Sequence, residues 1–498
     1  MSAAANSAVE AGCHGGRDTM RAAAEAAGKS EILARYEADY PRGPHDQPQS
    51  MCPAFGSLRV GLRMRRVATI LSGSACCVYG LTFTSHFYGA KRTVGYVPFN
   101  SETLVRGQLF EDIREAVLKI TDPAAYDAVV VINLCVPTAS GVPLDLLPKQ
   151  INGVRIIGID VPGFGVPTHA EAKDVLAGAM LRAARQEAEQ GPVARPRQMA
   201  AGDTVTLLGD LFPADPPTVA AMLAPMGLAV APQCPAREWR DLYASLDCIA
   251  VAAVHPFYTA SIREFAAAGR PVVGSAPVGL SGTAAWLEAI ARVANIPAAK
   301  LDEAKAKALP PIAAALQQHR LTARVTVAGY EGSELLVARL LIEAGAEVPY
   351  VGTACPRTEW SEPDRAFLES RGTHVQYRAS LEQDLAAMRF AKPHLALGTT
   401  PLVQAAKQEA IPAVYFTNII SARPLFGAPG AASLAAIVAA QTGGSERFAR
   451  MVEFFEGVGT GDVTGYGWKG APDLHPEARA KAKRMREARA KAAEAVGT

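Results

Sequence analysis

Short apolar runs alternate with amphipathic segments along most of the chain. Three early runs, at 67–73, 127–134 and 154–161, are rich in β-branched residues, which is typical of buried parallel strands. Apolar residues recur with helical spacing in 101–120 and in 170–190, and we expect one helix in each of these segments. The pattern predicts a strand–helix repeat.

The same pattern begins again at two later points. One restart is the strand-like run at 204–210, and the other is the strand–helix–strand pattern at 324–352. Successive units of this kind predict an α/β fold with three doubly wound, Rossmann-like domains and mostly parallel sheets.

Changes in composition place the domain boundaries. We expect an N-terminal arm at 1–50, a first α/β domain at 51–200, a second at 201–322, a third at 323–470 and a charged C-terminal helix at 471–498. The first domain contains the cysteine pattern described below, and we expect it to bind a cluster.

Composition and charge exclude several classes of protein. The 498 residues are 49% hydrophobic and 20% charged, which fits a globular chain. A net charge of +2 gives no electrostatic reason to expect nucleic acid binding. The chain has neither a long apolar run nor a secretory signal, so we expect a cytoplasmic protein that does not cross a membrane.

The chain lacks a convincing nucleotide-binding motif. Gly28-Lys29-Ser30 imitates the end of a phosphate-binding loop, but Ala23 stands where that loop needs glycine. The glycine run at 457–461 follows helical rather than strand sequence. We expect this chain to bind no nucleotide and to hydrolyse no ATP.

Cysteines follow two of the predicted strands, and one more cysteine precedes the first of these strands. Cys76 and Cys77 come after the run at 67–73, Cys135 directly follows the run at 127–134, and Cys52 lies shortly before the first strand. Loops after parallel strands share one edge of a sheet, and a [4Fe–4S] cluster takes four ligands that are usually cysteines. Free cysteine is also a common core residue, so packing remains an alternative.

The other cysteines and two histidines have weaker claims. We expect Cys13 to be a free thiol and Cys248 to be a core residue, and we expect Cys234 and Cys355, which each precede a proline in a loop, not to be ligands. His86 and His255 are candidates to face a substrate. For both histidines the simpler alternative is a side chain whose hydrogen bonds are satisfied inside the fold.

Five sequence blocks resemble the catalytic subunits of nitrogenase-like enzymes. Their sequences are most similar to the Y-subunit family of chlorophyllide a reductase from phototrophic bacteria, and the resemblance covers about residues 50–470. The blocks are MCPAFGSLR, SGSACCVYGLTFTSHFYGAKR, SETLVRGQLFEDI, NLCVPTASG and GIDVPGFGVPTHAEA. The resemblance implies a fold like that of the nitrogenase MoFe protein.

The resemblance also implies a ligand set. In that family three cysteines bind one [4Fe–4S] cluster at the interface with a second catalytic subunit, and Cys52, Cys77 and Cys135 match them at steps of 25 and 58 residues. Cys76 is the rival for the middle position. Cys77 is preferred because Val78-Tyr79-Gly80 after it resembles the family's block.

The implied activity is that of an oxidoreductase acting on a carbon–carbon double bond with an iron–sulfur protein as donor. Ferredoxin-linked electrons would reduce the C7=C8 bond of ring B of chlorophyllide a to a bacteriochlorin in bacteriochlorophyll synthesis. The implied partners are a Z subunit, in a Y2Z2 heterotetramer, and a separate X subunit that docks transiently and hydrolyses the ATP.

Three alternatives stay open at this point. The chain could be a related nitrogenase-like subunit, such as the N subunit of dark protochlorophyllide reductase. It could also be a non-catalytic tandem α/β binding or scaffold protein, because fold does not determine function. A glycosyltransferase-like enzyme with two facing α/β domains is the third, but it leaves the cysteine placement without a purpose.

Overall fold

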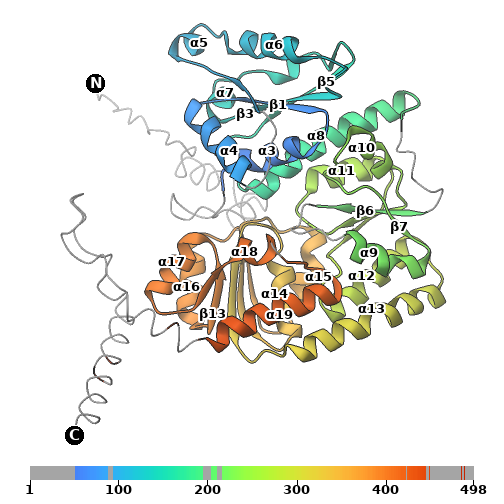
Figure 1. Ribbon diagram of the computed structural model, residues 1–498, viewed down its shortest axis with the longest axis vertical. Coiled ribbons are helices and arrows are strands. Elements are labelled where there is room, and N and C mark those ends of the chain that lie inside the picture. The colour runs from blue at the N-terminus through green and yellow to red at the C-terminus, as the bar shows by residue number, and fades with distance from the viewer. Residues whose placement is uncertain are drawn as a thin grey trace, which may run out of the picture.

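The structure is a computed structural model that describes residues 51–87, 94–194, 203–209, 216–421 and 423–444, with 448, 484 and 487 as isolated positions. Cys13, the predicted N-terminal arm, the glycine run at 457–461 and most of the predicted C-terminal helix lie outside the described residues. Within the described residues the strands form three sheets, which lie in the blue, green and orange parts of Figure 1.

The first sheet has the strand order β2-β1-β3-β5-β4. Every neighbouring pair is parallel except the short edge pair β4–β5. The strands are β1 (Val67–Ser72), β2 (Val94–Val97), β3 (Ala128–Asn133), β4 (Gln150–Ile151) and β5 (Val154–Asp160). Each residue of β3 is fully buried, as the continuous apolar run predicts for a central parallel strand.

Helices cover both faces of this sheet. They are α3 (Pro53–Arg63), α4 (Ala75–Phe87), α5 (Ser101–Val105), α6 (Leu109–Ile120), α7 (Cys135–Ala139) and α8 (His169–Gln190), with a 3₁₀ turn at Leu144–Leu146. The single helix expected over 101–120 is wrong, because α5 ends before Gly107, whose φ of +65° is left-handed. A left-handed residue stops a helix and favours glycine. Leu109, Ile113 and Val117 form the buried face of α6, as their spacing predicts.

The second sheet has the order β7-β6-β8-β9, and its pairs are parallel. Its strands are β6 (Thr204–Leu208), β7 (Ala229–Val230), β8 (Ala250–Ala253) and β9 (Val272–Gly274). The helices around it are α9 (Pro216–Leu223), α10 (Trp239–Leu246), α11 (Thr259–Ala267) and α12 (Leu280–Val293), with a 3₁₀ turn at Ala224–Met226.

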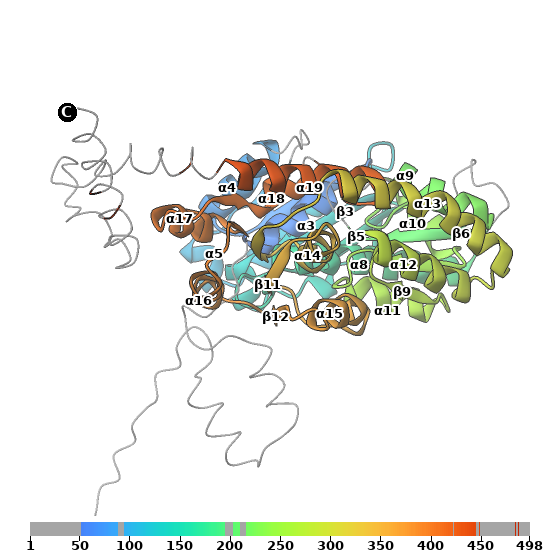
Figure 2. The same ribbon diagram turned by 90° about the horizontal axis from the view of Figure 1, so that it is seen from below.

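The third sheet, β12-β11-β10-β13-β14, is parallel throughout. Its strands are β10 (Arg324–Gly329), β11 (Glu347–Thr353), β12 (His374–Tyr377), β13 (Leu395–Gly398) and β14 (Ala413–Tyr415). Its helices are α14 (Glu334–Glu343), α15 (Glu362–Glu369), α16 (Leu381–Ala391), α17 (Thr400–Gln408), α18 (Phe416–Ser421) and α19 (Gly427–Gly443), with a 3₁₀ turn at Glu359–Ser361. The long helix α13 (Ala298–Gln318) joins the second unit to the third and packs against α19 (Figure 2).

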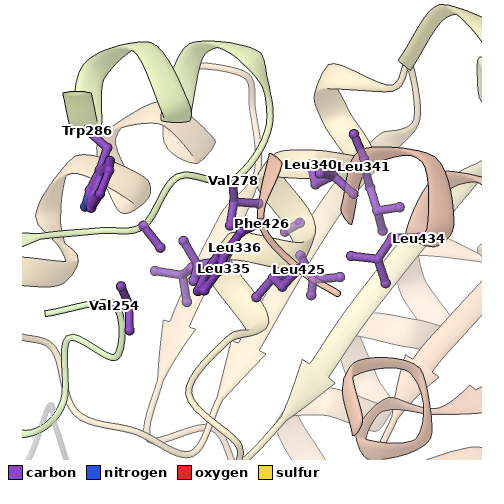
Figure 3. Packing of buried hydrophobic residues seen from close by; sticks show 14 of the residues in the cluster. Val254, Val278, Trp286, Leu335, Leu336, Leu340, Leu341, Leu425, Phe426 and Leu434 are labelled. Carbon is purple, nitrogen blue, oxygen red and sulfur yellow. The ribbon is translucent and has the colours of Figure 1, made fainter. Parts of the chain in front are cut away.

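The hydrophobic cores are shared between sheets. One cluster joins the second and third units, and Figure 3 shows Trp286 and Val278 of the second unit in the same cluster as Leu336 and Phe426 of the third. A second cluster joins α3, α8 and the first sheet to the second unit. Because apolar burial is the main stabilising term, this sharing holds the three sheets in one assembly.

Helix α3 packs so closely on α8 that one position tolerates no side chain. A Cβ added at Gly56 would lie 1.9 Å from the carbonyl oxygen of His169, whereas a Cβ added at Gly80 of α4 meets nothing within 4 Å among the described atoms.

We therefore expect Gly56→Ala to lower the free energy of unfolding by about 2 kcal/mol or more, because overpacking forces the two helices apart. Gly80→Ala is the matched control and should be neutral or slightly stabilising, since alanine favours a helix. Urea unfolding of both variants measures the difference. Equal stability of the two variants would contradict the tight α3–α8 contact.

Candidate functional site

The strand orders define where each unit would bind a ligand. In open α/β sheets ligands bind beyond the carboxyl ends of the strands, where the strand order reverses. In the first sheet this switch point lies between β1 and β3, in the second between β6 and β8, and in the third between β10 and β13. Candidate chemistry is present at all three points.

The predicted cysteines reach the switch point of the first sheet. Cys76 and Cys77 follow β1, and Cys135 follows β3, which pairs with β1 in parallel so that Ser72 lies beside Asn133. Helix α3 ends just before β1 begins, so it runs back along the sheet and brings Cys52 to the same edge.

Helix starts rather than loops hold these thiols. Cys52 is the residue before α3, Cys76 and Cys77 lie in the first turn of α4, and Cys135 is the first residue of α7. The expectation of cysteine-bearing loops is therefore wrong in detail, because each strand passes into a helix within two or three residues. The result is a firmer framework for the thiols than a loop would supply.

Electrostatics link the three predicted ligands. Burial raises the pKa of the Cys52 thiol, the amide of Ala54 opposes that shift, and the charge of Cys135 adds to it. Burial also raises the pKa of Cys77, with further increases from Cys76, Cys135 and Cys52. These mutual contributions agree with the strand pairing, which brings the three thiols to the same edge of the sheet.

The neighbouring Cys76 has a different environment. A hydrogen bond with Ser74, whose Oγ lies 3.0 Å from Cys76 Sγ, lowers its pKa, and Cys77 lowers it further. The influences on Cys76 therefore come from its own helix turn, whereas those on Cys77 include Cys52 and Cys135 across the edge. This difference favours Cys77 as the member that faces the other two.

The thiols match the chemistry of an iron–sulfur cluster. The backbone N–H of Gly163, in the loop after β5, donates to Cys135 Sγ at 3.1 Å, and hydrogen bonds of this kind tune cluster potentials. In the described part of the chain no three His, Cys, Asp or Glu side chains come together to hold a single metal ion. A four-iron cluster is larger than one ion, so its ligands stand farther apart than those of a mononuclear site.

Exposed apolar side chains lie close to the cysteines in the sequence. Tyr79 and Phe83 on α4 are 73% and 61% exposed, Val136 beside Cys135 is 36% exposed, and Phe164 beside Gly163 is 55% exposed. The rings of Tyr79 and Phe83 stack at 6.2 Å. Large apolar residues gathered at one place on a surface mark an interaction site.

The two candidate histidines differ in what the structure describes. The side chain of His86, near the end of α4, lies outside the described residues. His255, after β8 at the second switch point, is 1% exposed, and its Nε2 lies 2.8 Å from the carbonyl oxygen of Glu331. Its ring also makes edge contacts with Phe257 and Tyr258. This is the internally hydrogen-bonded state that was the simpler alternative.

A polar junction that sequence reasoning missed joins the three units. His169 Nε2 lies 3.2 Å from Glu331 Oε2, and both side chains are buried. Burial lowers the pKa of His169, so we assign a neutral imidazole that donates its N–H to the carboxylate. Burial alone would raise the pKa of Glu331, but the hydrogen bonds from His169 and Thr417 and the charge of Lys173 outweigh burial and lower that pKa.

A further buried carboxyl, that of Glu334, lies beside this junction. Glu334 accepts hydrogen bonds from the N–H groups of Glu331 and Gly332 in the loop after β10 and from Thr353, and burial raises its pKa to about 7. Anions bind to loop amides at this place in α/β folds, and here the chain's own carboxyl occupies them. Acidic residues inside the apolar turn YEGSELL were the signal that could have revealed this feature.

Of the three remaining described cysteines, Cys248 is a core residue as expected, and Cys234 and Cys355, which were predicted to lie in loops, are buried too. Cys234, Cys248 and Cys355 are fully buried, and burial raises the pKa of each thiol.

Residues 52–442 match the protein family described as nitrogenase component 1 type oxidoreductase. The match spans more than half of the chain and includes all three predicted cluster cysteines. The chain therefore belongs to the nitrogenase component 1 type oxidoreductase family.

Two curated relatives are similar over nearly their whole length. The chain is 64% identical over 483 residues to the chlorophyllide reductase 52.5 kDa chain of Cereibacter sphaeroides, covering 97% of this chain and 96% of that one. It is 63% identical over 488 residues to the protein of the same name from Rhodobacter capsulatus, covering 98% of each.

Solved structures confirm the predicted fold class. The nitrogenase Cp1 structure at pH 6.5 superposes with a TM-score of 0.62 at 17% identity, covering 85% of this chain and 97% of that one. The Cp1 structure at pH 5 gives 0.61 at 12% identity, with 81% and 90% covered. Identities this low carry the fold alone. In the described residues no helix is both long and apolar enough to cross a membrane.

The buried carboxyl of Asp384, which lies in α16, allows a prediction of how stability depends on pH. Burial, helped by the charge of Glu334, raises its pKa to about 8, although the hydrogen bond that Tyr350 donates at 2.9 Å lowers that pKa. An unfolded aspartate has a pKa of about 3.9. The unfolded chain therefore ionises first as pH rises, so this carboxyl's contribution to stability is full below about pH 4 and is lost as pH approaches 8.

We expect Asp384→Asn to remove this contribution to the decline of wild-type stability between about pH 4 and 8. Urea unfolding at pH 5 and pH 8 measures the slope. Glu382→Gln, an exposed position in the same helical turn, is the matched control and should keep the wild-type slope. An unchanged slope in Asp384→Asn would show that Asp384 does not titrate in this range.

Proposed function

We propose that this chain is the Y-type subunit of a chlorophyllide reductase and that Cys52, Cys77 and Cys135 bind a [4Fe–4S] cluster together with one ligand from a partner subunit. The observation that carries the proposal is the meeting of these three thiols at the switch point of the first sheet. The names of the two relatives support the substrate.

The chain's own residues would prepare the site in three ways. Helices α3, α4 and α7 hold the thiols at one edge, Gly163 donates a hydrogen bond to Cys135, and Cys76 stays beside Ser74. When bound, the cluster supplies a one-electron carrier. Because thiolates are the binding form, loading the site releases protons from thiols whose pKa is raised by burial.

A partner subunit would complete the site. Three thiols leave one position of a four-ligand cluster open. Cys52 and Cys77 are exposed and Cys135 is half-buried, and the apolar side chains of Tyr79, Phe83, Val136 and Phe164 are exposed as well. A Z subunit packing over this surface would bury those side chains and keep water from the cluster, which affects the potential. We propose a Y2Z2 catalytic assembly.

The electron source, the bond that is reduced and the role of ATP are implied by the resemblance and are part of the same proposal. Ferredoxin-linked electrons reduce the C7=C8 bond of ring B of chlorophyllide a, and a separate X subunit hydrolyses the ATP. The lack of a phosphate-binding loop in this sequence supports that division of labour.

Incubating the complex with the reductase, ATP and chlorophyllide a should give the absorption spectrum of a bacteriochlorin. Reduction of ring D of protochlorophyllide instead would favour the related dark reductase.

The two adjacent cysteines offer a matched pair of variants. We expect Cys77→Ser to lower the iron content of the anaerobically purified complex at least about tenfold, because loss of a ligand typically abolishes cluster retention. Cys76→Ser should keep the wild-type iron content and the wild-type EPR signal of the reduced cluster. Chemical iron analysis and EPR on the same samples check both expectations.

The opposite result, iron lost in Cys76→Ser and kept in Cys77→Ser, would exchange the roles of the two cysteines. Full iron in both single variants, and in Cys52→Ser and Cys135→Ser, would rule out this ligand set.

A further inference from the structure

The position of Cys52 depends on how α3 is packed. The Cys52 side chain makes no capping hydrogen bond to α3 within the described residues, and the first two turns of the helix, from Pro53 to Leu58, are buried. The amides of Ala54 and Phe55 act on the thiol, but both belong to α3 itself, so they cannot set the position of Cys52 relative to the other cysteines. That position is set by the surface on which the start of α3 lies.

That surface is the first turn of α8. The missing Cβ of Gly56 leaves room for the His169 carbonyl, Ser57 Oγ donates to the carbonyl of Ala172, and the rings of Phe55 and His169 lie 6.5 Å apart. The start of α3 therefore rests on residues 169–173, and a shift of this turn would move Cys52.

The first turn of α8 is held in turn by the third unit. His169 pairs with Glu331 in the loop after β10, and Glu171 pairs with Arg378, which follows β12, through two contacts of 2.6 and 2.7 Å. The Arg378 side chain is 5% exposed and that of Glu171 is 19% exposed. The Glu171–Arg378 ion pair is stiff because separating it would leave a buried charge unpaired, and the Glu331 carboxylate in the same way depends on its hydrogen bond from the neutral His169.

Both members of the Glu171–Arg378 pair make further contacts that hold them in place. Arg378 has a left-handed φ of +51°, and its guanidinium also donates to the carbonyl of Ala354 at 3.1 Å. Thr168 caps α8 by accepting from the Glu171 N–H at 3.1 Å, and its hydroxyl donates to the Glu171 carboxylate at 2.9 Å. The carboxylate of Glu171 is thus the point where the helix cap and the third unit meet.

We propose that Glu331 and Arg378 of the third unit are positioning residues for Cys52, acting through His169 and Glu171 in the first turn of α8. The inference rests on the proposed role of Cys52 as a cluster ligand. The contacts that would fix the start of α3 lie within this chain and do not depend on the cluster. The consequence is that the ligand-facing edge of the third sheet and the cysteine edge of the first sheet are coupled, so that a change at one alters the other.

The test uses Glu171→Gln in the full-length, iron-free chain. The variant keeps the size of the side chain and removes the charge that Arg378 pairs with. Hydrogen–deuterium exchange in residues 54–60 should accelerate on the order of tenfold, since local opening becomes easier, while exchange in β10 and β13 stays at the wild-type rate. In the iron-loaded complex the EPR signal should broaden because Cys52 becomes less well positioned.

The matched control is Glu187→Gln at the far end of the same helix. Glu187 pairs with Arg155 at 2.6 Å and is 21% exposed, which closely matches Glu171. Its loss should leave exchange in residues 54–60 unchanged. Glu331→Gln, which keeps hydrogen-bonding groups opposite His169 and Thr417, should reproduce the effect of Glu171→Gln and serves if that variant folds poorly.

Unchanged exchange at 54–60 in both Glu171→Gln and Glu331→Gln, or equal acceleration in Glu187→Gln, would overturn the positioning role. These outcomes are distinct from failure of the proposed function, which would appear as absence of iron from the wild-type complex whatever the exchange rates.

Discussion

Parallel pairing of β1 with β3 is the constraint on which the candidate site depends. The register that places Ser72 beside Asn133 ends both strands at one edge, and each strand passes almost at once into a helix whose first turn contains cysteine. Since neighbouring parallel strands lie only about 4.8 Å apart, Cys77 and Cys135 are brought together although 58 residues separate them in sequence. The third thiol, Cys52, lies at the start of α3, and the position of α3 is set by its close contact with α8.

The rest of the structure supports that edge through buried polar contacts between units. Apolar clusters hold the three sheets together over large areas, but they do not by themselves determine the exact position of one helix start. Directional contacts do so: His169 with Glu331 and Glu171 with Arg378. Each requires that a buried charge keep its partner, which makes the relative placement of the first and third units specific.

Much of the fold was predictable from the sequence, because strand–helix alternation is a local property of apolar spacing. The strand at 128–133 and the helix at 169–190 appear almost as their patterns predict. The break at Gly107 was missed because left-handed backbone is not visible in hydrophobic spacing. The cysteine edge was predictable from strand ends and from family resemblance. The junction around His169 and Glu331 was not, because it depends on contacts between residues 162 positions apart.

The central claim is that this chain, with its partner, holds one four-iron cluster at the edge formed by β1, β3 and α3. The most direct measurement is Mössbauer spectroscopy of the complex purified anaerobically from cells grown on ⁵⁷Fe. The account predicts the spectrum of a [4Fe–4S] cluster at one cluster per copy of this chain. A well-folded complex whose spectrum shows no such cluster would contradict it.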